Sequence, residues 1–266
     1  DATPYYTIDT TQIERAITKK TKAILPVHLT GEPADMTPIM QIAKKYDLPV
    51  VEDACQAILA SIDGKMAGTW GVAAGFSLHP LKNLNVWGDA GVSVTSQETV
   101  KEKLNLRRNH GLKTRDEIEV FGYNSRLDSI QAIVGNWLIK QTEDITEKRI
   151  CFGAMYDAAF SQMGDRIRLA PRRKNAKRVF HLYMFEVEDT VRDRLYQFLH
   201  ENGVDAKVHY PIPLYQQNGL AHLGYKPGDF PETDRQARQV LTLPVDQHLT
   251  EQEVQYCIDT VKKFFR

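Results

Sequence analysis

Two buried-strand patterns flank one amphipathic helix pattern near the start of the chain, and this order constrains the fold more than any other feature. Residues 23–27 form a continuous apolar run, and residues 50–51 open a second one. Between them, apolar side chains recur at helical spacing over residues 39–46. A strand, a helix and a strand joined by short links predict a βαβ unit, and therefore a parallel sheet with right-handed crossovers.

The rest of the chain extends this sheet and then changes character. Residues 73–77 and 91–95 read as further strands, and a long helical pattern begins near residue 125. After it, strands are predicted at 180–187 and 204–209, between helical patterns. We therefore expect an α/β protein in which residues 1–145 form a large domain with a mainly parallel sheet. Residues 146–266 are expected to form a smaller C-terminal α+β domain.

The bulk composition excludes several classes of partner. The 266-residue chain carries 34 Lys and Arg against 34 Asp and Glu, which argues against nucleic acid or an anionic membrane surface as the main partner. No apolar run approaches the ~20 residues that a membrane-spanning helix needs. The three cysteines are far apart, which favours a reducing cytoplasm over a disulfide framework. Neither the cysteines nor the histidines have the spacing of a metal site, and we expect none.

One lysine stands out because of what surrounds it. Lys82 follows the apolar strand at 73–77, and its neighbours Asn83 and Leu84 do not belong to a charged face. Most lysines are solvated surface residues. A lysine that is partly desolvated between strand ends has a lowered pKa and can attack a carbonyl carbon, as Schiff-base chemistry on a pyridoxal cofactor requires.

Other polar residues follow the ends of the predicted strands. Asp53 ends one strand and Ser77 ends another, and ligands of open α/β sheets bind at the carboxyl ends of strands. Asp53 is either a turn residue or the partner of a protonated pyridine nitrogen. Ser77 and Asn124 are either turn residues or phosphate ligands, and Gln56 is either a half-buried polar residue or a neighbour of Asp53 round a short turn.

These residues lie within a set of motifs that resembles one known family. The chain closely resembles the DegT/DnrJ/EryC1/StrS sugar aminotransferases, which are pyridoxal 5'-phosphate enzymes of the aspartate-aminotransferase fold, also called fold type I. The matching stretches, in chain order, are 51–57, 75–83, 88–91, 107–111, 122–128, 181–183, 209–214 and 224–231. They cover nearly the whole chain.

The resemblance implies a role for each candidate residue of the cofactor site. It implies that Lys82 is the catalytic lysine that forms the Schiff base, and that Asp53 pairs with the pyridine nitrogen. It places Gln56 by the phenolic oxygen of the ring and Ser77 at the cofactor phosphate. It also implies a homodimer with shared active sites, in which Asn124 reaches the phosphate bound by the neighbouring subunit.

The resemblance also implies a reaction and a class of substrate. The reaction is transamination of a keto sugar, usually a nucleotide-linked keto-deoxy-hexose, with glutamate as the amino donor, in amino-sugar biosynthesis. His209 and Tyr210 lie in a segment that approaches the sugar in similar proteins. Three alternatives stay open: amination of a keto sugar acid such as an oxidised octulosonate for lipopolysaccharide, a sugar dehydratase, or a non-catalytic sensor. Dehydratase relatives carry a histidine in place of Lys82, which argues against the second.

Two departures from the family pattern stand out. Ala90 replaces a glycine that the family often has between an acid and a second glycine. The family fold also includes an N-terminal part with a Ser/Gly-Thr phosphate loop and an aromatic residue that stacks on the cofactor ring. We expect that this chain begins after that part.

Overall fold

The first half of the chain is built on a mixed sheet of three strands in the order β1-β4-β5. The computed structural model describes all residues from 1 to 266. Strand β1 (Val51–Asp53) pairs in parallel with β4 (Ala73–Ser77), and β4 pairs antiparallel with β5 (Gly91–Val94). The run at 23–27 lies parallel to the β1 segment through single bridges from Ile24 to Val50 and from Val27 to Asp53. Helix α2 (Met36–Lys45) lies between these two strands in sequence, so the predicted βαβ unit is confirmed.

The second half surrounds an antiparallel sheet in the order β6-β8-β9. Its strands are β6 (Arg168–Leu169), β8 (Tyr183–Glu186) and β9 (Val240–Leu243). Every residue of β8 and β9 is buried, because helices α5 (Thr142–Phe160), α6 (Asp189–Glu201) and α8 (Glu251–Phe264) pack around them. The resulting core of 19 buried residues lies entirely within residues 152–261, and removing this apolar surface from water stabilises that half.

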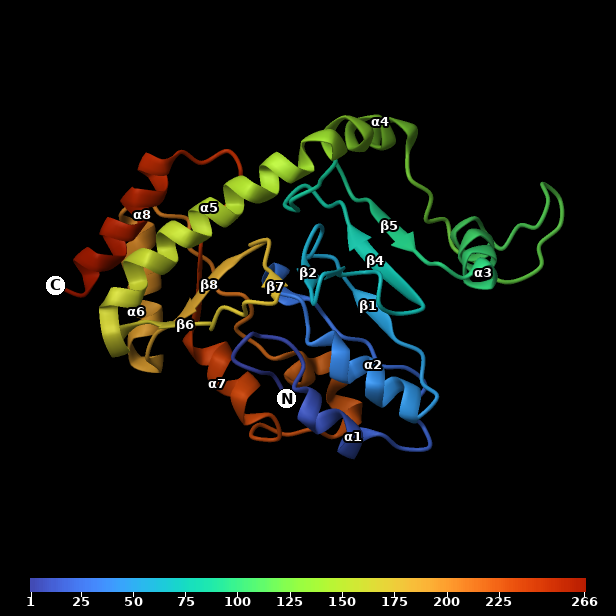
Figure 1. Cartoon of the computed structure of the whole chain (residues 1–266), viewed down its shortest axis with the longest axis horizontal. Helices are drawn as coiled ribbons and strands as arrows, with labels where there is room; N and C mark the ends of the chain where they lie inside the picture. The colour runs from blue at the N-terminus through green and yellow to red at the C-terminus, as the bar shows by residue number, and fades with distance from the viewer.

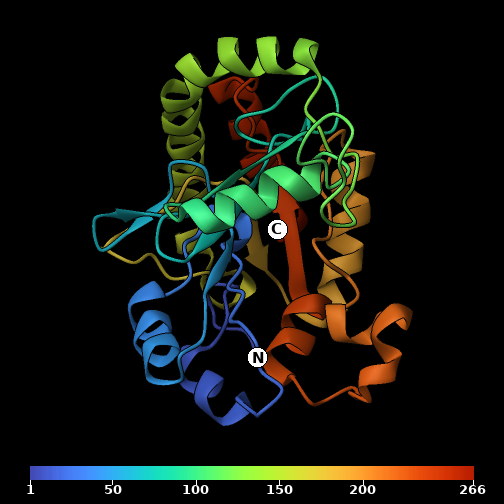
Figure 2. The ribbon, with the colours of Figure 1, turned by 90° about the vertical axis from the view of Figure 1, so that its right-hand side faces the viewer.

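A pair of long helices and a small sheet connect the two halves of the chain. Helices α4 (Ser129–Leu138) and α5 (Thr142–Phe160) form one long arc over the molecule, with the second-half helices at one end and β4 and β5 below the other (Figure 1). A small sheet joins β2 (Ser61–Ile62) and β3 (Lys65–Met66) from the first half to β7 (Ala176–Lys177) from the second. In the orthogonal view, α3 (Glu98–Arg108) crosses the front of the molecule (Figure 2).

The other elements are short or peripheral. They are η1 (Thr10–Gln12), α1 (Ile13–Ala16), η2 (Leu29–Gly31), η3 (Ile139–Gln141), η4 (Ser161–Arg166), η5 (Leu214–Gln216), η6 (Asn218–Leu223) and α7 (Pro231–Gln239). None of the helices has the length and apolar character needed to cross a membrane.

Some predicted elements differ from the structure. The expected strand at 204–209 is reduced to a single bridge between Lys207 and Thr242, because this segment leaves the sheet edge to line a cavity. The predicted parallel sheet also ends at β4, since β5 returns antiparallel to it. The long helical pattern from residue 125 begins as a helix only at Ser129 and is divided by the 3-10 turn η3.

Candidate active site

A cavity of about 840 Å³ opens where the two halves meet. Its first wall comes from the end of β4 and the loop that follows it, including Ser77 and Lys82. The opposite wall comes from the second half, including His181, His209 and the residues after β9. The strand ends of the first sheet therefore face a surface supplied by the second core, as expected for an α/β ligand site.

Lys82 lies on the loop that follows β4, and it is half-buried in the cavity wall. Its backbone N–H donates to the carbonyl of His79 at 2.8 Å, and its own carbonyl accepts from Asn85 Nδ2 at 2.9 Å, so the loop is fixed on both sides. Burial lowers the pKa of Lys82, although the nearby Cys55 and Asp53 act in the opposite direction. The partly desolvated amine that the sequence predicts is present.

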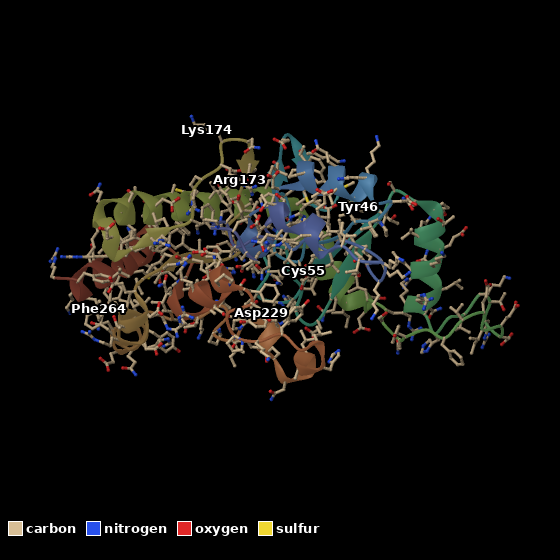
Figure 3. The ribbon with its side chains drawn as sticks, turned by 90° about the horizontal axis from the view of Figure 1, so that it is seen from below. Tyr46, Cys55, Arg173, Lys174, Asp229 and Phe264 are labelled. Carbon is tan, nitrogen blue, oxygen red and sulfur yellow. The ribbon has the colours of Figure 1, made fainter.

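Asp53 closes β1 beside this loop without forming part of the cavity lining. Its Oδ1 accepts from the backbone N–H of Cys55 at 3.0 Å, so it does serve as a turn residue. Its second carboxylate oxygen has no recorded partner, and its charge acts on Lys82. Cys55 lies near the centre of the molecule (Figure 3), and burial together with Asp53 raises the pKa of its thiol to about 11.

Gln56 reaches the cavity with a defined amide orientation. Its side-chain oxygen Oε1 accepts from the backbone N–H of Thr30 at 2.6 Å. Because a backbone N–H can only donate, the atom facing Thr30 must be the oxygen, and the amide NH₂ is left to point elsewhere. The Gln56 side chain therefore offers a hydrogen-bond donor at the cavity, which suits an anionic or phenolic oxygen.

Ser77 and Asn124 differ in how they relate to the cavity. Ser77 lines it, and its Oγ accepts from the backbone N–H of His79 at 3.3 Å, which leaves the hydroxyl proton free to donate. Asn124 is exposed and lies outside the lining, with its Oδ1 accepting from Arg126 Nε at 3.2 Å. The next three residues, 125–127, do line the cavity. Within one chain, the structure does not bring Asn124 to Ser77.

The predicted substrate residues lie on the far side of the cavity. His209 is half-buried, with Nδ1 2.7 Å from Thr242 Oγ1, and burial lowers its pKa. Tyr210 follows it at the cavity surface, with 54% of its side-chain area exposed. Both residues therefore face the same space as Lys82, from the opposite wall.

Two cavity residues were given no role by the sequence reasoning. Arg149, on α5, is almost fully buried and donates to the carbonyls of Phe180 and His181 and to Gln247 Oε1. Arg149 lies in an ordinary helical pattern, and nothing in the sequence around it indicates a functional role. His181 stood in a recognised motif, and it has a buried Nδ1 with no hydrogen-bond partner. Burial, with the nearby charge of Lys82, lowers the pKa of His181 to about 3, so the ring is neutral.

A third overlooked residue, Glu52, fixes the strand that carries Asp53. Its buried carboxylate accepts from the backbone N–H groups of Gly68, Trp70 and Gly71 at 2.6–2.7 Å. It also accepts from His28 Nε2 at 3.0 Å, because His28 Nδ1 is itself an acceptor for Ala34 N–H. A carboxylate satisfied by four donors is stable inside a protein, and these bonds lower its pKa although its burial raises it.

The donor set fits the pyridoxal phosphate implied by the sequence resemblance. A half-buried amine with a lowered pKa, an amide donor and a serine hydroxyl share one cavity, and a carboxylate lies just behind the amine. The unpartnered His181 Nδ1 adds a neutral polar group to the same wall. An aldehyde, a ring oxygen and a phosphate each meet a chemically suitable side chain among them.

Comparison with known proteins agrees with this geometry. Residues 2–262 match the DegT/DnrJ/EryC1/StrS aminotransferase family. The chain is 40% identical to a Geobacillus stearothermophilus protein named pleiotropic regulatory protein, over 98% of this chain and 70% of that protein. It is 35% identical to dTDP-3-amino-3,4,6-trideoxy-alpha-D-glucose transaminase of Streptomyces venezuelae, over 97% of this chain and 67% of that enzyme.

The fold matches as well. The crystal structure of DesV from S. venezuelae superposes with a TM-score of 0.94 at 34% identity, covering 99% of this chain and 70% of that one. Together with the cavity and its half-buried lysine, these matches show that the chain belongs to the DegT/DnrJ/EryC1/StrS family of pyridoxal-phosphate-dependent aminotransferases.

Proposed function

We propose that this aminotransferase transfers an amino group from glutamate to a nucleotide-linked keto-deoxy-hexose. The observation that carries the proposal is the half-buried Lys82 amine, whose pKa is lowered by burial, in a cavity it shares with Ser77 and Gln56. The name of the S. venezuelae transaminase supports a nucleotide-linked sugar as the acceptor.

The proposed cofactor residues each perform one task. Lys82 Nζ would bind the aldehyde carbon of pyridoxal phosphate, Ser77 would donate to the phosphate and Gln56 would donate to the ring oxygen. Asp53 would keep the ring nitrogen protonated through its free carboxylate oxygen. When bound, the cofactor supplies an electron sink for the charge that develops on the substrate carbon.

Lys82 then acts as the proton carrier. Once the amine of the donor had replaced Lys82 at the aldehyde carbon, the freed lysine, whose lowered pKa favours the neutral amine, would take the proton from the α-carbon of the donor and return it on the cofactor side. His181 stays neutral beside it and adds no competing positive charge to this part of the wall. In the second half of the cycle, the same amine moves the proton in the opposite direction.

The acceptor sugar is proposed to lie between Lys82 and the far wall. His209 and Tyr210 reach this space from the opposite side, and His209 is held by its contact with Thr242. Burial lowers the pKa of His209, which favours a neutral ring that can hydrogen-bond a sugar hydroxyl.

We also propose a homodimer with shared sites, working in the cytoplasm. Asn124 is exposed outside the cavity of its own chain, and α4 exposes apolar side chains including Ile133 and Trp137, so both are free to meet a second subunit. The three cysteines are unpaired, as in a reducing compartment. The two units of each subunit are proposed to be residues 1–145 and 146–266, since separate cores occupy the two halves.

The variant Lys82→Ala tests the chemistry. We expect the purified protein with pyridoxal phosphate to show a visible absorbance band from the lysine-bound cofactor, and the variant to lack both the band and transamination. The exposed Lys174→Ala should keep both. Unchanged absorbance and activity in Lys82→Ala would reject the proposal.

A panel of keto sugars would then identify the acceptor. Formation of 2-oxoglutarate from glutamate is followed with nucleotide-linked 3-keto and 4-keto hexoses and with an oxidised octulosonate. We expect turnover with a nucleotide-linked sugar. Turnover with the sugar acid alone would contradict the proposed acceptor class while leaving the aminotransferase chemistry intact.

A further inference from the structure

Thr30 has a backbone conformation that a β-branched residue rarely adopts. Its φ is 61° and its side chain is fully buried. Three polar contacts hold it there: its N–H donates to Gln56 Oε1 at 2.6 Å, its carbonyl accepts from His181 N–H at 3.0 Å, and its Oγ1 accepts from Arg178 Nη2 at 2.8 Å. Such a conformation persists only where its surroundings fix it.

The Thr30 N–H decides which end of the Gln56 amide faces the cavity. If Thr30 relaxed toward an ordinary conformation, its N–H would turn away and Gln56 would lose the contact that orients it. The next residue, Gly31, is also tightly placed, since a Cβ there would lie 2.8 Å from Val179 Cγ2 and 3.1 Å from the backbone carbonyl oxygen of Gln56. The backbone at 30–31 is therefore shaped closely around Gln56.

Arg178 is buried with most of its hydrogen-bond donors unsatisfied. Its side chain is buried, it lies over the ring of Phe180 at 5.0 Å, and its hydrogen bond to Thr30 is the only one that its guanidinium makes. Its Nε and Nη1 have no partner. Burying a charged group with unsatisfied donors is unfavourable, so a purely stabilising role does not explain this arginine.

We propose that Arg178 and Thr30 are positioning residues that fix the Gln56 amide with its NH₂ toward the ring oxygen of the cofactor. Arg178 donates to the Thr30 hydroxyl, the Thr30 N–H donates to the side-chain oxygen Oε1 of Gln56, and the Gln56 NH₂ donates to the ring oxygen. This inference rests on the proposed function of Gln56. Through these contacts, the second half of the chain would influence the electronics of a cofactor bound by the first half.

The test is a spectroscopic pH titration of the bound cofactor in the intact protein. A hydrogen-bond donor at the ring oxygen stabilises the anionic form of that oxygen. It therefore lowers the affinity of the lysine-bound cofactor for the proton that is lost in the titration. Losing that donor therefore raises the pH midpoint of the visible absorbance change, by about one pH unit for one hydrogen bond to a charged group. We expect this upward shift in Arg178→Met and in Thr30→Ala, whereas Thr30→Ser keeps the hydroxyl and the original midpoint.

Arg173→Met is the matched control. Arg173 is also a partly buried arginine from the second half, bound to Glu32 and the carbonyl of Pro33, but it does not contact Thr30 or Gln56. It lies next to the exposed Lys174 in the loop before β7 (Figure 3). We expect Arg173→Met to leave the midpoint unchanged, even if it lowers thermal stability.

A double-mutant cycle separates positioning from general destabilisation. In the Gln56→Ala background, Arg178→Met should cause no further shift of the midpoint. Equal shifts in Arg178→Met and Arg173→Met, or an added shift in the Gln56→Ala background, would overturn the inference. Absence of a Lys82-dependent absorbance band in the unmutated protein would instead overturn the proposed function itself.

Discussion

At the level of single residues, the cavity is an environment that suppresses positive charge. Lys82, His181 and His209 all face it, and burial lowers the pKa of each. Desolvation penalises the charged form of a base, and here it acts on three neighbours at once. The two histidines are therefore neutral near neutral pH, and the Lys82 amine is shifted toward its neutral form, which suits proton transfer more than ion pairing.

The His181 environment has a consequence for acid stability. Its pKa is about 3 in the folded protein against an ordinary 6.5, so between these values the unfolded chain binds a proton that the folded protein does not. Stability is thus lost as the pH falls below about 6.5. We expect His181→Asn to reduce this loss by up to about 1.4 kcal/mol per pH unit, measured by denaturant unfolding between pH 7 and 4. Parallel curves for the two proteins would show that His181 does not titrate in this way.

The sequence predicted the polar residues better than it predicted their orientation. Lys82, Gln56, Ser77 and His209 share one cavity, as expected from strand ends and family motifs. The orientation of the Gln56 amide could not be predicted, because it depends on the backbone of a residue 26 positions earlier. Residues that act through such contacts leave no local pattern.

At the level of elements, the start of α8 is fixed by contacts within its own first turn. The capping box that opens α8 is present: Thr250 Oγ1 accepts from Glu253 N–H at 3.2 Å, and Glu253 Oε2 accepts from Thr250 N–H at 2.8 Å. The predicted strand at 204–209 was wrong. A strand depends on pairing with the edge of another strand, and a local apolar pattern cannot show whether such an edge is available.

The α8 cap predicts a measurable contribution to stability. Thr250→Ala leaves the backbone N–H of Glu253 without its acceptor, and we expect it to lower the free energy of unfolding by about 1 kcal/mol. Thr250→Ser should be close to the original protein, because it keeps the hydroxyl. Both are compared by urea unfolding. A serine variant as unstable as the alanine variant would show that the methyl group, and not the hydrogen bond, matters.

At the level of the whole molecule, one exposed surface contrasts with the two packed cores. Helix α4 has no buried residue, and Ile133 and Trp137 expose 69% and 65% of their surface. Both side chains belong to the helical pattern that begins near residue 125, but the sequence could not show that nothing in the same chain covers them. An apolar face of this kind is typical of an interface between subunits.

If the exposed apolar face of α4 forms the subunit interface, a charged residue introduced there should disrupt the dimer. Ile133→Glu should convert a dimer to a monomer, because a desolvated carboxylate without a partner is unfavourable in an interface. Thr190→Glu, on the exposed side of α6, should have no effect. Sedimentation velocity distinguishes the two states. A dimer that persists in Ile133→Glu would place the interface elsewhere.

Shared sites predict complementation between two defective subunits. In a mixture of Lys82→Ala and Asn124→Ala proteins, each hybrid dimer would contain one site with both native residues. Random exchange should restore about a quarter of the original activity. The measurement is transamination before and after mixing. No gain after verified subunit exchange would mean that Asn124 does not act across the interface.

The four donors around Glu52 also bear on how accurately this protein folds. Neighbouring residues of a strand point to opposite faces, so Glu52 and Asp53 enter different environments although both are carboxylates of similar chemistry. A slip of β1 by one position would exchange them, leaving three backbone N–H groups of the 68–71 loop without their acceptor and removing the charge beside Lys82. A misregistered chain would thus lose stability and cofactor chemistry together, so a partly active, misaligned form of the enzyme is not expected to accumulate.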